Sequence, residues 1–271
     1  MKKRAIRKVL LVGDTHSGSM FAPLPQPFSI EGGINIRPGA TMAWMNERWE
    51  RMVEWSDTPH HLVLIGDLVE GVHHRSTQMI SPEPGDHFAA ALALLEPLAA
   101  RVHKWGGRVY VIRGTEAHSK HAEHGLGQML GAVRDPVSRL HCWDMLRRKV
   151  CGTVCAFHHH APTTSRPWTR GTAMSVVGSF NRLNAIEGGA EPPRVVVTAH
   201  AHVGRVYIDA AGVCVAGFSW QGLTRYGHRV VPSSTVTVGA HMLDWSEKED
   251  GQDPEVRIFQ STVKLDPEGD L

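Results

Sequence analysis

Short apolar runs followed at once by polar residues form the main pattern along this chain. Four of the runs are continuous rather than alternating and are rich in Val, Ile and Leu, and they cover residues 9–12, 62–65, 109–112 and 195–197. Continuous runs of this length are typical of strands whose two faces are both buried. A fifth, weaker run at 150–157 predicts one more strand.

Helical patterns alternate with these runs. Residues 41–55 and 86–105 carry apolar side chains at helical spacing, and a third such segment covers 172–186. Alternation of strands and helices predicts an α/β architecture. After residue 203 the pattern changes to short segments separated by Gly and Pro, which predict antiparallel strands near 206–208, 213–216, 235–238 and 256–259. We therefore expect an α/β fold of two packed mixed β-sheets flanked by helices.

The length of 271 residues fits one large domain with insertions. We expect a single domain over residues 1–271, with loop insertions near 17–40, 71–85 and 161–190. Long loops at strand ends are more often functional than decorative, and open α/β sheets bind ligands at the carboxyl ends of their strands.

Charge, hydrophobic content and histidine content limit which classes of protein the chain can belong to. The net charge of +2 gives no argument for a nucleic-acid partner from total charge. No apolar run is long enough to span a membrane, and the first residues lack the apolar core of a signal peptide, so a cytoplasmic protein without a membrane partner is expected. The 18 histidines are the unusual feature, because many of them cluster directly after apolar runs.

Polar residues at five successive strand ends form a constellation. Residues i and i+2 of an extended segment point the same way, so Asp14 with His16, or His200 with His202, can grip one ion. Each motif alone is compatible with an ordinary turn or surface residue, but the ordered set after five strands is not. Carboxylates mixed with imidazoles suit Mn²⁺, Fe or Zn²⁺ better than Mg²⁺ or Ca²⁺. The motifs are Asp14-Thr15-His16, Gly66-Asp67, Gly114-Thr115-Glu116-Ala117-His118, His158-His159-His160 and His200-Ala201-His202.

The ordered set resembles the calcineurin-like metallophosphoesterase superfamily, whose pattern is Asp-x-His, Gly-Asp, Gly-Asn-His-Asp/Glu, His and Gly-His-x-His. The resemblance covers residues 14–202, and the Gly-Thr-Glu-Ala-His version of the third motif is similar to that of phage and prophage members. It implies an α/β/β/α sandwich and a phosphoesterase with two divalent metal ions. Mn²⁺ is the preferred metal, and Fe, Zn²⁺ or Ni²⁺ are the alternatives.

The resemblance also implies a ligand set. The first ion would be held by Asp14, His16, Asp67 and His202, and the second by Asp67, His158, His200 and a residue of the third motif. This chain has no asparagine in that motif, so Glu116 is expected to supply an oxygen in preference to Thr115. His158 directly follows its strand and is preferred over His159 and His160.

For catalysis the resemblance implies that a bridging hydroxide attacks phosphorus while His118 donates a proton to the leaving group. His74, Arg166, Trp168 and Arg170 are candidate substrate contacts from loops. The expected partner is a phosphate-ester substrate, which can be a nucleic acid or a nucleotide. The favoured activity is that of a phosphodiesterase or nuclease. A phosphomonoesterase or protein phosphatase, and a non-catalytic scaffold that keeps the fold, are the alternatives.

Overall fold

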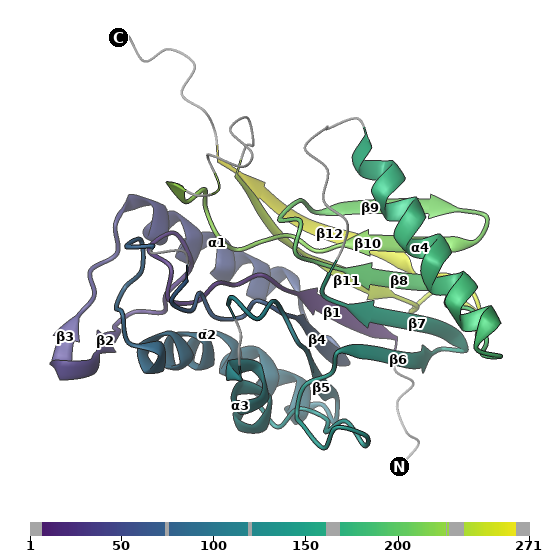
Figure 1. Ribbon diagram of the computed structural model, residues 1–271, viewed down its shortest axis with the longest axis horizontal. Coiled ribbons are helices and arrows are strands. Elements are labelled where there is room, and N and C mark those ends of the chain that lie inside the picture. Colours follow the sequence, from purple (N-terminus) through teal and green to yellow (C-terminus); the bar gives the residue numbers. More distant parts are fainter. Residues whose placement is uncertain are drawn as a thin grey trace, which may run out of the picture.

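The computed structural model describes residues 7–73, 76–118, 121–160, 169–225, 227 and 236–263. Its central feature is a pair of five-stranded mixed sheets packed face to face with helices on both outer sides (Figure 1). This is the α/β architecture of two packed mixed sheets flanked by helices that the sequence pattern predicts.

The first sheet has the strand order β12-β11-β1-β4-β5. Its parallel centre consists of β1 (Lys8–Val12), β4 (His61–Ile65) and β5 (Arg108–Ile112). Beside β1 runs the antiparallel β11 (Thr237–Asp244), which in turn pairs with β12 (Glu255–Thr262) at the edge. The carboxyl ends of the three parallel strands therefore lie along one edge of this sheet.

The second sheet has the order β6-β7-β8-β10-β9. Here β7 (Thr153–His158), β8 (Val195–Thr198) and β10 (Gly212–Ala216) are parallel. The antiparallel strands β6 (Met145–Val150) and β9 (Arg205–Asp209) close its two edges.

Helices cover the outer face of each sheet (Figure 1). On the first sheet, α1 contacts β11 and β12, while α2 contacts β4 and β5. On the second sheet, α4 lies over β8, β9 and β10. The bounds are Ala40–Trp55 for α1, Pro84–Lys104 for α2, Ala122–Met129 for α3 and Arg170–Glu187 for α4, and a small excursion before α1 holds β2 (Ser29–Ile30), η1 (Glu31–Gly33) and β3 (Ile34–Asn35).

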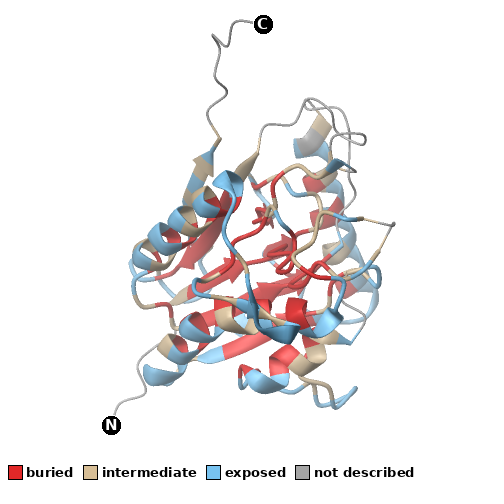
Figure 2. Ribbon diagram, turned by 90° about the vertical axis from the view of Figure 1, so that its left-hand side faces the viewer, coloured by how far each residue is buried: buried red, intermediate tan, exposed pale blue. Residues whose placement is uncertain are grey.

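Alternate residues of the central strands belong to different layers of the core. Leu10 of β1 packs with residues of α1 and α2, whereas its neighbour Leu11 packs between the two sheets against residues such as Phe157. Figure 2 shows the buried strands in the interior of the molecule. Because both faces of these strands are covered, the apolar runs are continuous rather than alternating.

Two segments differ from the expectation. The weak strand expected at 150–157 is a hairpin of two strands, β6 and β7, joined through Cys151 and Gly152 with φ of 45° and 75°. Two successive residues with positive φ are typical of the tight turn that suits strand twist. Helix α3 was not predicted, because eight residues are too few to show a helical period.

No helix in the described ranges has both the length and the apolar composition that crossing a membrane requires.

Candidate metal centre

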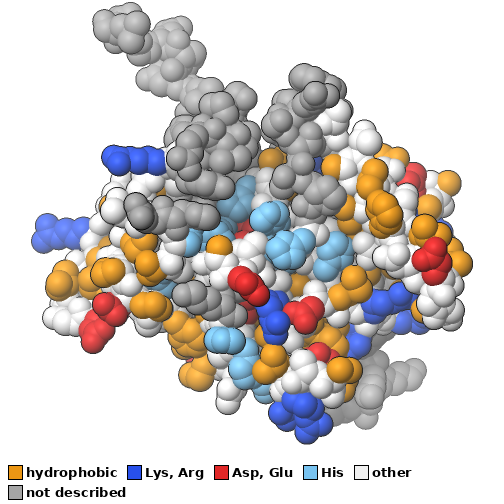
Figure 3. Space-filling model, in the orientation of Figure 1, with side chains coloured by type: hydrophobic (Ala, Val, Ile, Leu, Met, Phe, Trp, Pro, Cys, Tyr) orange, Lys and Arg blue, Asp and Glu red, His pale blue; other side chains and the backbone are white. Residues whose placement is uncertain are grey.

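The site lies where the carboxyl ends of the parallel strands of both sheets meet. Asp14 and His16 follow β1, and Asp67 follows β4, so the first sheet contributes both carboxylates. His159 follows β7, and His200 with His202 follows β8 of the second sheet. In the space-filling view, histidine side chains gather near the centre of the face shown (Figure 3).

The backbone at this site is unusual. Asp14, His16, Asp67, His200 and His202 all have positive φ, at 47°, 42°, 49°, 69° and 53°. This left-handed region is uncommon for residues other than glycine, and such residues cluster at functional sites where surrounding structure holds them. The turns therefore aim five polar side chains into one space at a cost in local stability.

Hydrogen bonds between the turns hold this conformation and connect the two sheets. The N–H of Asp14 donates to the Gly66 carbonyl at 2.9 Å, and the N–H of His16 donates to the Asp67 carbonyl at 3.0 Å. Across the sheets, the N–H of His200 donates to Oδ2 of Asp14 at 3.1 Å. The relative position of the candidate ligands is thus set by the backbone.

Asp67 is the centre of the arrangement and is almost completely buried. Its Oδ1 accepts hydrogen bonds from the N–H of Thr115 at 2.7 Å and from the Thr115 hydroxyl at 3.0 Å. Its Oδ2 lies 3.1 Å from Nε2 of His159. A Cβ atom on Gly114 would lie only 2.2 Å from Oδ1 of Asp67, so glycine is required there for this close approach.

Three imidazoles point Nε2 into the site because their Nδ1 atoms have partners behind them. Nδ1 of His159 lies 2.8 Å from the Ile65 carbonyl, and Nδ1 of His118 lies 2.6 Å from the Glu70 carbonyl. A carbonyl can only accept, so both Nδ1 atoms carry the proton and donate. Nδ1 of His16 lies 3.0 Å from Oε2 of Glu70. Donation from the far nitrogen to a carbonyl or carboxylate is the usual arrangement of metal-binding histidines.

The donor atoms form four overlapping groups, and the atoms of each group lie within 4.8 Å of one another. Two features show that they fit cations. Nε2 of His16 lies 3.1 Å from Nε2 of His202, so one cation could contact both nitrogens. Buried Oδ1 of Asp14 accepts no hydrogen bond from the described residues. The groups are Asp14–His16–His202, His16–Asp67–His118, Asp67–His159–His200 and Glu70–His73–His118.

Without a cation, the buried charges compete for protons. Burial raises the pKa of Asp14 to about 7, helped by the negative charge of Asp67 and opposed by His159. Burial alone would also raise the pKa of Asp67, but the hydrogen bond and charge of His159 outweigh it and hold that pKa well below its usual range. Reciprocally, burial would lower the pKa of His159, but Asp67 and Asp14 raise it to about 9.

His118 is the opposite case. Burial, together with the positive charge of His16, lowers the pKa of His118 to about 4. Without bound cations, its Nε2 is therefore unprotonated at neutral pH, whereas the role expected from the sequence requires a proton there. The geometry instead makes Nε2 of His118 a lone-pair donor beside His16 and Asp67.

The structure brings together Asp14, His16, Asp67, His118, His200 and His202, as the sequence motifs predicted, but it places His159 rather than His158 against Asp67. Phe157 faces the core between the sheets, and His159, two residues further, points the same way. His158 points instead toward α4, where its Nε2 lies 3.1 Å from Nδ2 of Asn181. The preference for His158 therefore needs correction.

Glu116 also departs from its expected place. It is exposed and belongs to none of the four groups, whereas Thr115 contacts Asp67 through both its N–H and its hydroxyl. The glycine before Thr115 lets this turn approach Asp67 closely, and the backbone then directs the next side chain outward. Thr115 thus supports Asp67 by hydrogen bonds, and no carboxylate from this motif reaches the cluster.

Among the candidate substrate contacts, His74, Arg166 and Trp168 lie outside the described residues. Arg170 is the first residue of α4, and its side chain lies outside the described part.

Glu70 contacts the cluster but was not among the candidate residues singled out from the sequence. Its carboxylate is buried and accepts a hydrogen bond from Nε2 of Gln221 at 2.6 Å besides its contact with His16. Burial alone would raise the pKa of Glu70, but the hydrogen bonds from His16 and His73 keep it well below its usual range. A signal was available, because Glu70 ends the segment that continues from Asp67 through two apolar residues.

Comparisons with known proteins give structural likeness only. No family model matches the chain, and no curated protein matches it. Among solved structures, an archaeal phosphodiesterase is 10% identical over 94% of this chain and 99% of that chain, with a TM-score of 0.47. The vacuolar protein sorting 29 protein of Cryptosporidium parvum is 14% identical over 96% of this chain and 98% of that chain, with a TM-score of 0.43. These TM-scores lie below 0.5, so function must be inferred from this chain's own residues.

Replacing Asp14 by Asn should stabilise the metal-free protein at alkaline pH. The folded pKa of about 7 lies above the ordinary 3.8, so the contribution of Asp14 is fully present below about pH 3.8 and is lost as the pH rises to about 7. With chelator at pH 8, Asp14→Asn should raise the free energy of unfolding by roughly 1–4 kcal/mol, and the difference from wild type should shrink toward pH 5. Thermal or urea denaturation with chelator measures this.

The same variant should lose most of the stabilisation that added Mn²⁺ gives the wild type, because a ligand oxygen is removed. An Asn variant that is less stable than wild type in chelator at pH 8, or equally stabilised by Mn²⁺, would contradict this account of Asp14.

Proposed function

We propose that this protein is a dinuclear metal-dependent phosphoesterase. One observation carries the proposal: imidazole Nε2 atoms, held by hydrogen bonds at their far nitrogens, surround two buried carboxylates, Asp14 and Asp67. A buried set of this kind has more donors than a structural ion requires and is open on one side, since the side chain of His202 is 38% exposed. Open coordination is characteristic of catalytic rather than structural metal sites.

Two sets of residues would hold the ions. Asp14, His16 and His202 form the first set, while His159 and His200 form the second, and Asp67 can serve both with its two oxygens. Mixed imidazole and carboxylate donors suit Mn²⁺, Fe, Zn²⁺ or Ni²⁺. When bound, such ions activate water and neutralise charge on the phosphate group.

The remaining residues orient this machinery. Thr115 fixes the Asp67 carboxylate, and Glu70 fixes the ring of His16 by its carboxylate and that of His118 by its carbonyl. His118 then presents an unprotonated nitrogen beside the space where a phosphate group would be held. Outer partners of this kind usually contribute about tenfold to a hundredfold to metal affinity or activity.

We further propose a phosphodiester as substrate, within a nucleotide or a single-stranded nucleic acid. Support comes from the sequence, where Arg166, Trp168 and Arg170 follow the histidine triplet closely enough to hold a phosphate and a base together. The small net charge favours a short or single-stranded ligand over an extended duplex.

The protein loaded with Mn²⁺ should hydrolyse bis(p-nitrophenyl) phosphate with a higher kcat/KM than p-nitrophenyl phosphate. Asp67→Asn should lower both activities by at least about a hundredfold, because the shared ligand is changed, and serves as the control for contaminating enzymes. A large preference for the monoester would overturn the diester assignment. Folded, metal-loaded protein without either activity would favour the non-catalytic scaffold.

Metal content should separate the neighbouring histidines. His159→Ala should bind about one ion fewer than wild type, because its Nε2 points at Asp67. His158→Ala is the matched control and should keep the wild-type content, because that ring contacts Asn181 instead. Elemental analysis of the purified variants gives the result, and metal loss in the His158 variant alone would reverse the assignment.

His118→Ala should reduce hydrolysis of activated and unactivated diesters by similar factors. An unprotonated Nε2 cannot donate to a leaving group, so the quality of that group should not matter. Comparing p-nitrophenyl with alkyl leaving groups tests this. A loss confined to the alkyl esters would restore His118 to the acid role expected from the sequence.

A further inference from the structure

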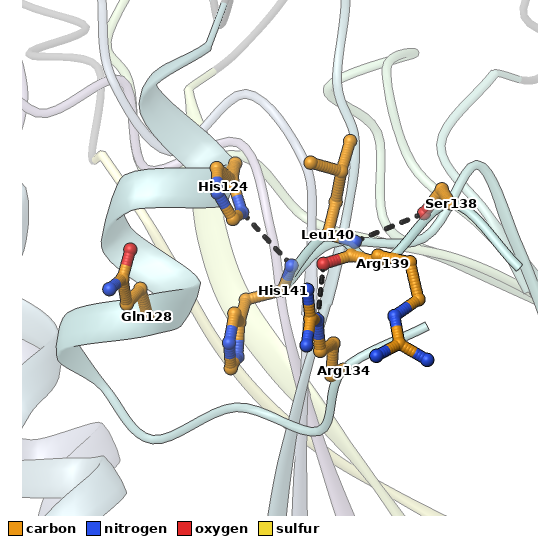
Figure 4. A pocket seen from close by; sticks show the side chains of 7 residues that line it. All are labelled: His124, Gln128, Arg134, Ser138, Arg139, Leu140 and His141. Carbon is orange, nitrogen blue, oxygen red and sulfur yellow. Dashed lines mark hydrogen bonds between the residues drawn. The ribbon is translucent and has the colours of Figure 1, made fainter. Parts of the chain in front are cut away.

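A second candidate binding site lies between α3 and the segment that leads into β6. The pocket there has a volume of about 460 Å³, within the range of small-molecule sites. Figure 4 shows its lining, with His124 and Gln128 on α3 and the other lining residues on the 134–141 segment. None of them belongs to the four candidate metal groups.

The charge of the lining has one sign. Arg134 and Arg139 contribute two guanidinium groups, and no carboxylate is among the lining residues. Arg134 donates through Nε to the Arg139 carbonyl, which leaves its two terminal nitrogens for a ligand. Within the described residues neither arginine forms an ion pair, in contrast to Arg113 with Asp144 and Arg194 with Asp253.

The nearby Asp135 keeps its negative charge but is not among the lining residues, and its oxygens face donors within the loop. Oδ1 accepts the N–H of Val137 at 3.0 Å, and Oδ2 accepts the hydroxyl of Ser138 at 2.7 Å. These bonds fold the loop that carries both arginines. Arg139 itself has a φ of 65°, a conformation rare for a large side chain and retained only where the surroundings impose it.

Two imidazoles, His124 on α3 and His141 at the end of the arginine-bearing segment, also line the pocket. Nδ1 of His124 accepts the N–H of His141 at 3.0 Å, so the neutral ring carries its proton on Nε2 and remains a donor. The rings of His124 and His141 are stacked, with centroids 5.9 Å apart and planes 27° apart. The amide of Gln128 adds a further donor. Guanidinium, imidazole and amide donors around a pocket of this size suit a phosphate group, and the imidazole rings suit a flat aromatic ring in the same ligand.

We propose that this pocket binds the phosphate group of a nucleotide, at a site separate from the metal centre. The phosphate lies against Arg134 and Arg139, and the base lies along the paired rings of His124 and His141. The phosphate can belong to a free mononucleotide or to a nucleotide within a strand. The proposal does not rest on the proposed function, because binding here requires neither the metal ligands nor turnover.

Calorimetric titration of the full chain with adenosine monophosphate, in chelator so that the metal centre holds no phosphate, tests the proposal. Wild type should bind saturably, and Arg134→Gln should weaken binding about tenfold to a hundredfold, because a charge-assisted contact is lost. Arg139→Gln is the second variant. Arg51→Gln removes the same charge from exposed α1, where Arg51 pairs with Glu47, and should leave binding unchanged.

Adenosine without phosphate should bind at least about tenfold more weakly than the monophosphate. Equal binding of both, or equal affinity of the Arg134, Arg139 and Arg51 variants, would overturn the site. Titration with a single-stranded hexanucleotide distinguishes a free nucleotide from a strand. If Arg134→Gln weakens binding of the monophosphate alone, the free nucleotide is the ligand. If Arg134→Gln weakens binding of the hexanucleotide by the larger factor, a strand is the ligand.

Discussion

Two carboxylates buried where the sheets meet impose the constraint on which the rest of the site depends. Asp14 and Asp67 are buried, and a charge in such surroundings is costly unless opposite charge or hydrogen-bond donors lie close to it. Imidazoles and the two hydrogen-bond donors of Thr115 lie close to these carboxylates. The raised pKa of Asp14 nevertheless indicates that they offset only part of the cost of burying its charge. Divalent cations would complete it, so function and local stability conflict in their absence.

The packing of the strands offsets the local cost of the buried carboxylates and of the turns that carry them. Left-handed turns at Asp14, Asp67 and His200 are unfavourable, but each follows a strand whose two faces are covered by core side chains. A hydrogen bond from the turn after β8 to the turn after β1 joins the sheets at the same point. Large, well-packed cores therefore support a small strained region, which is the usual arrangement of active sites.

Identical side chains acquire different properties within a few ångströms. Two carboxylates raise the pKa of His159 to about 9, whereas burial and the charge of His16 lower the pKa of His118 to about 4. Both donate from Nδ1 to a backbone carbonyl, so the difference lies in what Nε2 faces. Neighbouring charge, more than residue type, decides which imidazole can act as donor or acceptor.

The sequence by itself determined the layered fold, because continuous apolar runs require strands covered on both faces. It also indicated which residues meet at the strand ends, because parallel strands bring residues such as Asp14, Asp67 and His200 to one edge. It could not choose between His158 and His159. Strand alternation shows that their side chains lie on opposite faces of the sheet, but it does not show which face packs against the other sheet. Nor could the sequence exclude Glu116 or include Glu70, because turn conformation and burial decide which carboxylate points inward. In the tertiary structure, the packing of Phe157 between the sheets turns His159 toward Asp67, and the turn at Gly114 brings Thr115 rather than Glu116 against it.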